Sequence, residues 1–258
     1  GEMADQSVEW LRKRDWITVP PFADYCWRMI MMTPERQKVN PFFTGGEVIS
    51  VSFPTSEMSP SDKRQSLRGN NIGYARATVH HELIPGHHLQ MYSNERFQPH
   101  RRTMSTPFWL EGLAVYWELK LYDDGFARTP EERMGMLVWR AHRCARIIFS
   151  LNFHLGRFSP DQCVDFLVDN VGFERRNATA EVRRSIGPSY PPLYQVAYML
   201  GALQIRQLHR EMVLSGEMTE RDFHDSIMEA GMLPIAMLRQ VLKQEPLQRD
   251  EPPRWKFN

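Results

Sequence analysis

The sequence predicts a mainly α fold of the α+β kind, with a small β-sheet near the N-terminus. From Tyr74 almost to the end, several segments begin with Ser-Pro or Thr-Pro and end at glycine. These are typical first and last residues of separate α-helices. Before that point, residues 48–53 are mostly β-branched or aromatic and carry the strongest strand signal in the chain. The 258 residues, 42% of them hydrophobic, are enough to bury a sizeable core.

The elements of the N-terminal part follow from local patterns. A helix is expected over residues 1–13, where apolar side chains recur at helical spacing. The proline-rich stretch 17–46 is too broken for long elements. The strand at 48–53 is closed by Pro54, which lacks a backbone N–H, so we expect it at an edge or end of the sheet. Residues 56–71 are polar and are predicted to form a loop.

The rest of the chain is predicted to be helical. The best framed helix has Thr106 as N-cap, Pro107 in its first turn and Gly125 just past its end. Helical segments are expected, in order, over residues 74–94, 106–125, 129–156, 159–172, 179–187, 191–216 and 219–244.

These elements are interpreted as a single domain over residues 1–258. Within it, the small sheet and its loops occupy about 16–70, and a helical bundle occupies about 74–245. The first residues lack the basic start and apolar core of a signal peptide, and they have the pattern of a helix interior. We therefore expect a fragment of a longer protein, whose missing N-terminal region packs on this domain. The compartment of that parent protein is not predicted.

Composition excludes several classes of function. The net charge is +1 and no basic run dominates any segment, so no nucleic-acid partner is expected. The longest apolar stretches are far shorter than the ~20 residues of a membrane-spanning helix, so no membrane span is expected. Three widely separated cysteines form neither a disulfide framework nor a C-x-x-C motif.

One short stretch, ATVHHELIPGHHLQ at 77–90, contains four of the nine histidines. His81-Glu82 is typical of the start of a zinc-peptidase helix, H-E-x-x-H, in which the second histidine follows at i+4. Here position i+4 is Pro85. On an undistorted helix, i+6 lies about 120° off the face of His81, and i+7 lies roughly 10 Å along the axis. Neither His87 nor His88 could then share an ion with His81.

A distortion at Pro85 resolves this conflict. Proline removes an N–H and clashes with the carbonyl of residue i−4, which is His81, so a kink or bulge is expected there. Gly86 tolerates the backbone angles that re-enter the helix. A bulge that absorbs the extra residues favours His87 over His88 as the second ligand. The competing interpretation is a cluster of histidines at a surface helix end or in the core.

Catalysis by zinc needs three protein ligands, an open position and a nearby base. Glu82 points about 100° away from His81 on a helix, which suits a base that is not a ligand. Glu111 is the candidate third ligand, because a carboxylate among apolar residues is costly unless it is paired or bound to metal. Glu118, at i+7 from Glu111, could hydrogen-bond a ligand histidine. Alternatively, it is a solvated charge beside Lys120.

Three motifs resemble a known family. HHELIPGHHLQ, FWLEGLAVYWE and PPLYQVAYMLGALQIRQL together resemble the C-terminal half of the bacterial domain-of-unknown-function family numbered 885, from about Trp10 to Gln240. ARIIFSLNFHLGRFSPDQCVDFL, which contains His154, looks like a fourth block of that family. The family is grouped with the gluzincin metallopeptidases, so the resemblance implies a zincin-like helical catalytic domain. It also implies one zinc ion per chain, held by two histidines and by Glu111.

The same resemblance indicates candidates for substrate contacts. Gluzincins often use a tyrosine to stabilise the oxyanion, and Tyr198 occupies the matching position, with Tyr190 and Tyr194 as alternates. Tyr198 at helical spacing among apolar neighbours could instead belong to the core. Arg206 and Arg210 could hold a peptide carboxylate through a bidentate fork, or could form ordinary surface salt bridges.

The sequence therefore predicts a zinc-dependent hydrolase of peptide or peptide-like amide bonds, with a small peptide-like substrate. Glu82 acts as general base toward a metal-activated water, and His81, His87 and Glu111 hold the metal. The strand at 47–53 could pair with an extended substrate. Manganese, cobalt or iron fit the same ligands less commonly. The alternative is a non-catalytic, metal-stabilised peptide-binding module, against which the presence of Glu82 argues.

Overall fold

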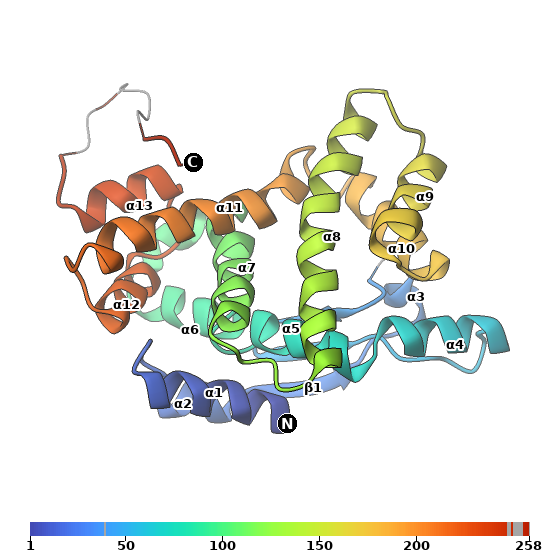
Figure 1. Cartoon of the computed structure of the whole chain (residues 1–258), viewed down its shortest axis with the longest axis horizontal. Coiled ribbons are helices and arrows are strands. Elements are labelled where there is room, and N and C mark those ends of the chain that lie inside the picture. The colour runs from blue at the N-terminus through green and yellow to red at the C-terminus, as the bar shows by residue number, and fades with distance from the viewer. Residues whose placement is uncertain (39, 247–248, 250–254, 258) are drawn as a thin grey trace.

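The computed structural model describes residues 1–38, 40–246, 249 and 255–257, and it confirms the expected fold class (Figure 1). Most of the elements are helices, and one small sheet lies near the N-terminus. The α-helices are α1 (Glu2–Arg14), α2 (Pro21–Tyr25), α3 (Pro34–Gln37), α4 (Pro60–Gly69), α5 (Ile72–Glu82), α6 (His87–Arg96), α7 (Pro107–Asp123), α8 (Pro130–His154), α9 (Pro160–Val171), α10 (Arg175–Ile186), α11 (Tyr194–His209), α12 (Glu220–Ala230) and α13 (Ile235–Leu242). A 3-10 helix, η1 (Pro99–Thr103), follows α6, and a π-helical turn, η2 (Arg210–Leu214), extends α11.

The sheet has three strands in the order β1-β3-β2, namely β1 (Arg28–Met31), β3 (Val48–Val51) and β2 (Phe43–Thr44). β3 pairs in parallel with β1 and antiparallel with β2. The expected edge strand is therefore the central one. That expectation was wrong because β3 ends at Val51, so Pro54 lies outside the ladder and its missing N–H costs nothing. With both of its edges paired, β3 is not free to pair with an extended substrate.

Two other local predictions need correction. Residues 56–71, expected to form a loop, contain the helix α4, because Ser59 caps the backbone N–H of Asp62 and Pro60 occupies the first turn. The segment 219–244 is divided into α12 and α13. The division lies where Gly231 adopts a positive φ of 72° and Pro234 precedes the first turn of α13.

The helix α7 lies at the centre of the molecule, with α11 crossing it (Figure 1). It is buried on nearly every side, and Trp109 and Trp117 are fully enclosed. A Cβ added at Gly112 of α7 would lie 2.6 Å from the Cα of Gly201 on α11. The two backbones thus lie closer together than side chains at these two positions would allow. This contact sets how the side chains of α7 and α11 lie relative to one another.

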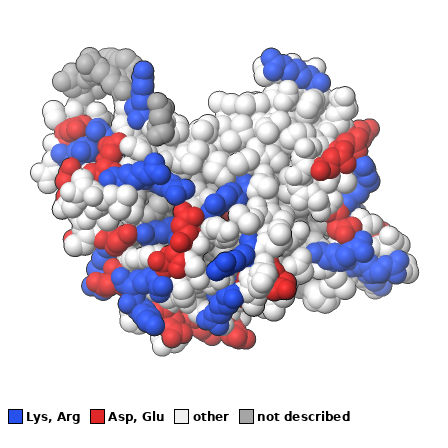
Figure 2. Space-filling view, in the orientation of Figure 1, with Lys and Arg blue, Asp and Glu red and all other residues white. Residues whose placement is uncertain are grey.

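The remaining elements surround this pair. α5 packs against α8, while α1, α2 and β1 lie together along one side of the bundle (Figure 1). On the face shown in Figure 2, basic and acidic side chains are interspersed and neither sign dominates. Among the described residues, no helix has both the length and the apolar character that crossing a membrane requires.

Candidate metal centre

The motif segment folds as two helices joined by a tight turn. α5 ends at Glu82, residues 83–86 turn with a cis Ile84–Pro85 peptide bond, and α6 begins at His87. A kinked continuous helix was expected, but the helix stops, because Pro85 can neither donate a hydrogen bond nor fit against the carbonyl of His81. A Cβ on Gly86 would lie 1.8 Å from that carbonyl oxygen. The close approach therefore requires glycine at this position. The backbone angle does not require it, because a φ of −84° is ordinary for any residue.

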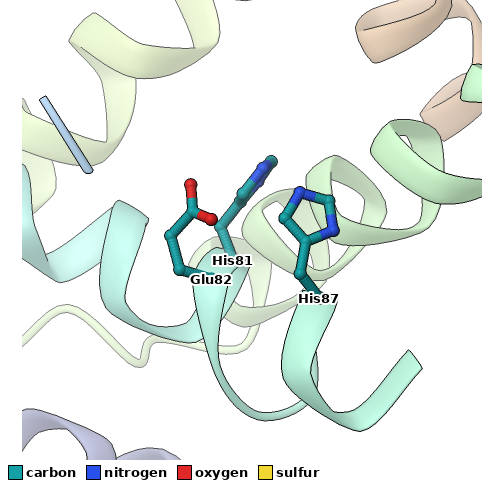
Figure 3. Close-up of side chains that lie close together, drawn as sticks. All are labelled: His81, Glu82 and His87. Carbon is teal, nitrogen blue, oxygen red and sulfur yellow. The ribbon is translucent and has the colours of Figure 1, made fainter. Parts of the chain in front are cut away.

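The turn brings His87 back to His81. Their ring centroids lie 4.8 Å apart, and one ligand-type atom from each of His81, Glu82 and His87 lies within 4.8 Å of the others (Figure 3). His88 faces the other way, where its Nε2 lies 2.7 Å from the carbonyl oxygen of Ala23. Of the two candidate second ligands, the structure places His87 at the site and His88 in contact with α2.

Glu111 of α7 completes the cluster. Its Oε2 lies 3.6 Å from Nε2 of His81 and 3.3 Å from Nε2 of His87. Ligand atoms around one tetrahedral zinc ion, at bond lengths near 2.0 Å, stand roughly 3.3 Å apart. Its other oxygen, Oε1, accepts a hydrogen bond of 2.6 Å from the hydroxyl of Tyr194. The two imidazoles and the carboxylate are therefore groups of the kind that bind zinc, and the two distances to Glu111 are compatible with a shared ion.

Both imidazoles are held through their Nδ1 atoms. The Nδ1 of His81 lies 2.6 Å from Oε1 of Glu118, and Arg143 donates to the same carboxylate oxygen at 2.7 Å. The Nδ1 of His87 lies 3.0 Å from Oε1 of Gln90. Such partners orient the rings of metal-binding histidines and leave the Nε2 atoms for the metal. Glu118 is 5% exposed, so the alternative of a solvated surface charge does not describe it.

The electrostatics of the cluster favour a cation. Burial opposes the charge on Glu118, but Arg143 and His81 outweigh burial and lower its pKa to about 2. Burial also opposes the charge on Glu111, whose pKa His87 and His81 nevertheless hold well below its usual range. Burial also opposes the charge on His87, but the neighbouring Glu111 outweighs it and raises the pKa of His87 to about 9. Two carboxylates thus stay ionised, and Glu111 stabilises positive charge at His87.

A cavity of about 260 Å³ opens onto the cluster, and its walls include His81, Glu82, His87 and Glu111. Tyr198 also lines it and is nearly parallel to His81, with the ring centroids 6.4 Å apart. Burial raises the pKa of the Tyr198 phenol, so the hydroxyl keeps its proton near neutrality.

The two alternate tyrosines are placed differently. Tyr190 lines the cavity, and its ring centroid lies 4.4 Å from that of Tyr194. Tyr194 is instead the hydrogen-bond donor to Glu111. Burial and the neighbouring Glu111 raise the pKa of Tyr194 above its ordinary value, which keeps it a donor.

Three predicted residues lie away from the site. Arg206 pairs with Asp123 at 3.0 Å, and Arg206 and Arg210 line a separate cavity. Arg206 thus forms a salt bridge, which was the alternative for it, and it lies eight residues past Tyr198 on the same helix, roughly 12 Å along its axis. His154 is exposed at the C-terminal end of α8 and does not line the cavity.

Other cavity residues were not predicted. Arg143 and Arg146 on α8 and Arg184 on α10 line the cavity. Arg143 and Arg146 are spaced i, i+3 within a helix that carries many apolar residues. This spacing was the feature of the sequence that could have indicated them. The segment 42–46 also lines the cavity, and a Cβ on Gly45 would lie 2.2 Å from Oε2 of Glu82. This glycine permits the segment to approach the candidate base closely.

Fold and site together define a mainly α protein with a candidate His-His-Glu metal centre at a helix break. The chain belongs to the family of bacterial proteins of unknown function DUF885, whose family model matches residues 4–242. No curated protein matches the chain in a sequence comparison.

Solved structures share its fold, among them the following two. One is of a "putative lipoprotein" from Colwellia psychrerythraea, with a TM-score of 0.77 and 21% identity, and the match covers 94% of this chain and 42% of that one. The other is of a "putative lipoprotein of unknown function" from Shewanella oneidensis, with a TM-score of 0.72, 20% identity, and coverage of 94% and 44%. The chain thus spans less than half the length of either protein.

Proposed function

We propose that the protein is a zinc-dependent hydrolase of peptide or peptide-like amide bonds, of the gluzincin kind. The observation that carries the proposal is the position of Glu111, whose Oε2 lies 3.3 and 3.6 Å from the Nε2 atoms of His87 and His81. Three such ligands and a base beside them are the composition of a catalytic zinc site, whereas structural sites close the fourth position with another protein ligand.

His81, His87 and Glu111 would hold the ion. When bound, zinc supplies Lewis acidity that activates a water molecule and polarises a carbonyl group. The remaining chemistry belongs to the protein. Glu82, at the end of α5, lies beside the ligands and lines the cavity. Its carboxylate accepts the proton of the attacking water and then donates it to the leaving amine.

Two tyrosines have separate roles in this proposal. Tyr198 keeps its proton and lines the cavity, so its phenol donates a hydrogen bond to the oxyanion that develops on the substrate carbonyl. Tyr194 occupies Oε1 of Glu111 and thereby directs Oε2 toward the two imidazoles.

The test measures zinc content and peptide hydrolysis on the same protein samples. After zinc is supplied and excess removed, the unmodified chain should carry about one zinc ion, as counted by elemental analysis. His87→Ala should lose the metal. The matched control is His88→Ala, which changes the adjacent histidine but alters contacts with Ala23 and Cys26 outside the cluster, and it should keep the metal.

Glu82→Gln separates catalysis from metal binding. It should retain zinc and lose about 100-fold or more of the hydrolysis rate on a mixed peptide library, because the amide cannot take the proton. If the chain takes up no zinc, the proposed zinc-dependent hydrolase is wrong. If zinc binds but the unmodified chain cleaves nothing, the protein is the metal-stabilised binding module instead.

A further inference from the structure

Three arginines line the cavity that opens onto the metal centre: Arg143, Arg146 and Arg184, here called the arginine wall. Arg143 and Arg146 come from α8 and are 4% and 2% exposed. Arg184 comes from α10, and 14% of its side chain is exposed. Guanidinium groups are costly to bury unless carboxylates or other acceptors pair with them.

The carboxylates beside the arginine wall do not balance it. Arg143 donates to Glu118 at 2.7 Å, and Arg146 donates to Glu181 at 2.7 Å. The third cation, Arg184, lies 3.8 Å from the same Glu181. Within these contacts two carboxylates serve three guanidinium groups, because the other two carboxylates that line the cavity, Glu82 and Glu111, belong to the candidate metal centre.

The wall also has spare hydrogen-bond donors. Among the described residues, neither Nη1 of Arg146 nor Nε of Arg184 has a hydrogen-bond acceptor, although both atoms are buried. The nearby His142 lies 3.4 Å from Glu181 and is not a source of a further charge near neutrality, since burial lowers its pKa to about 3. An anionic ligand with several acceptor atoms would satisfy both the charge and the donors.

Tyr198 connects the arginine wall to the metal centre. The guanidinium carbon of Arg146 lies 4.2 Å from the centre of the Tyr198 ring, and that of Arg143 lies 5.1 Å from it. The ring centroid of His81 lies 6.4 Å from the same Tyr198 ring. Each residue of an extended peptide spans roughly 3.5 Å. A group held by the wall is therefore within about three residues of a carbonyl at the metal centre.

We propose that the arginine wall binds a carboxylate of the peptide substrate and so places a bond within about three residues of that carboxylate at the metal centre. This inference rests on the proposed function and adds the substrate class. Guanidinium groups match a planar carboxylate with paired hydrogen bonds. The carboxylate is either the C-terminus of the peptide or the side chain of Asp or Glu, and both sources present the same chemistry.

The choice of variant follows from the pairing. Arg143 supports Glu118, which contacts His81, so its removal would disturb the metal centre. Arg184 has the longest pairing distance in the wall, so Arg184→Gln removes the most weakly paired of the three charges with the least effect on the fold. Arg184→Lys retains the charge without the planar fork. The matched control is Arg206→Gln, in the separate cavity.

The experiment uses the zinc-loaded chain and three peptides that share one sequence except for the last residue of the third. The first has a free C-terminal carboxylate, the second a C-terminal amide, and the third an amide with glutamate as its last residue. Values of kcat/KM are measured for hydrolysis, and calorimetry measures binding of each peptide to the inactive Glu82→Gln protein. We expect the free carboxylate to exceed the plain amide by about 10- to 100-fold in both readouts.

Arg184→Gln should remove most of that preference, Arg184→Lys should restore part of it, and Arg206→Gln should leave it intact. Recovery by the glutamate peptide would identify a side-chain carboxylate as the ligand, and its failure would identify the C-terminus. Equal cleavage of all three peptides, unchanged in Arg184→Gln, overturns the inference while the hydrolase stands. Absence of any cleavage counts against the proposed function, and the calorimetric comparison still decides the inference.

Discussion

At the scale of single residues, the contact that orients the candidate metal centre is the one between His81 and Glu118. Their side chains lie 2.6 Å apart, and Arg143 donates to the same oxygen of the Glu118 carboxylate at 2.7 Å. All three residues are buried. A histidine whose Nδ1 is held in this way presents its Nε2 in one orientation, which increases its affinity for a metal ion.

We expect Glu118→Gln to weaken zinc binding by about 10- to 100-fold, because the amide holds the imidazole without a charge. Competition with a chromogenic chelator measures this affinity. The control is Glu220→Gln, which removes another glutamate that pairs with a histidine, His209 at 3.0 Å, outside the site. The role assigned to Glu118 is wrong if both variants change zinc affinity equally.

At the scale of elements, the site depends on the crossing of α7 and α11. A Cβ on Gly201 would lie 2.3 Å from the carbonyl oxygen of Phe108 and 2.9 Å from Cα of Gly112. Because neither neighbour is a flexible side chain, any larger residue must push the helices apart. Glu111 on α7 and Tyr194 on α11 would then separate, although their hydrogen bond is 2.6 Å long.

Gly201→Ala should therefore lower the free energy of unfolding by about 1 to 3 kcal/mol, as overpacking in a core does. It should also weaken zinc binding, since Glu111 loses its support. Urea denaturation measures the first effect and chelator competition the second. Leu203→Ala, on the same helix and 40% exposed, is the control and should change stability by much less. Equal unfolding curves for Gly201→Ala and the unmodified chain would show that the crossing is not tight.

At the scale of the whole molecule, His224 links the C-terminal helices to the rest of the chain. Its Nδ1 lies 2.8 Å from the carbonyl oxygen of Trp16, and its Nε2 lies 2.9 Å from the hydroxyl of Tyr116. The side chain is buried, and burial lowers its pKa from 6.5 to about 3. The folded protein therefore keeps His224 neutral at pH values where the unfolded chain would bind a proton.

Stability should consequently fall as the pH drops below 6.5 toward 3, because only the unfolded state takes up the proton in that range. At pH 5, His224 should cost about 2 kcal/mol relative to pH 7. Urea denaturation of the metal-free protein at both pH values measures the difference. His224→Gln should show a smaller loss, while the buried His142 retains its own share. An identical pH dependence in the variant would contradict this account.

The sequence by itself determined the fold class and the types of residue at the site. Capping residues such as Thr129 and Ser159 act on their own helices, so they are visible without the tertiary structure. Glu111 and Glu118 also belong together by local spacing, because i and i+7 share one face of a helix. Local patterns missed α4 because its cap lies within a polar segment that is equally typical of a loop.

Only the tertiary structure decided which of these residues meet. The choice of His87 over His88 depends on how the chain turns at Pro85, and the spacing of Glu111 depends on where α7 lies. Arg143 and Arg184 belong to different helices, α8 and α10, so no periodicity relates them to one another. Arg206 shares a helix with Tyr198 yet faces another cavity. Local propensity acts through neighbours along the chain, whereas the site is formed by contacts between helices, which packing alone determines.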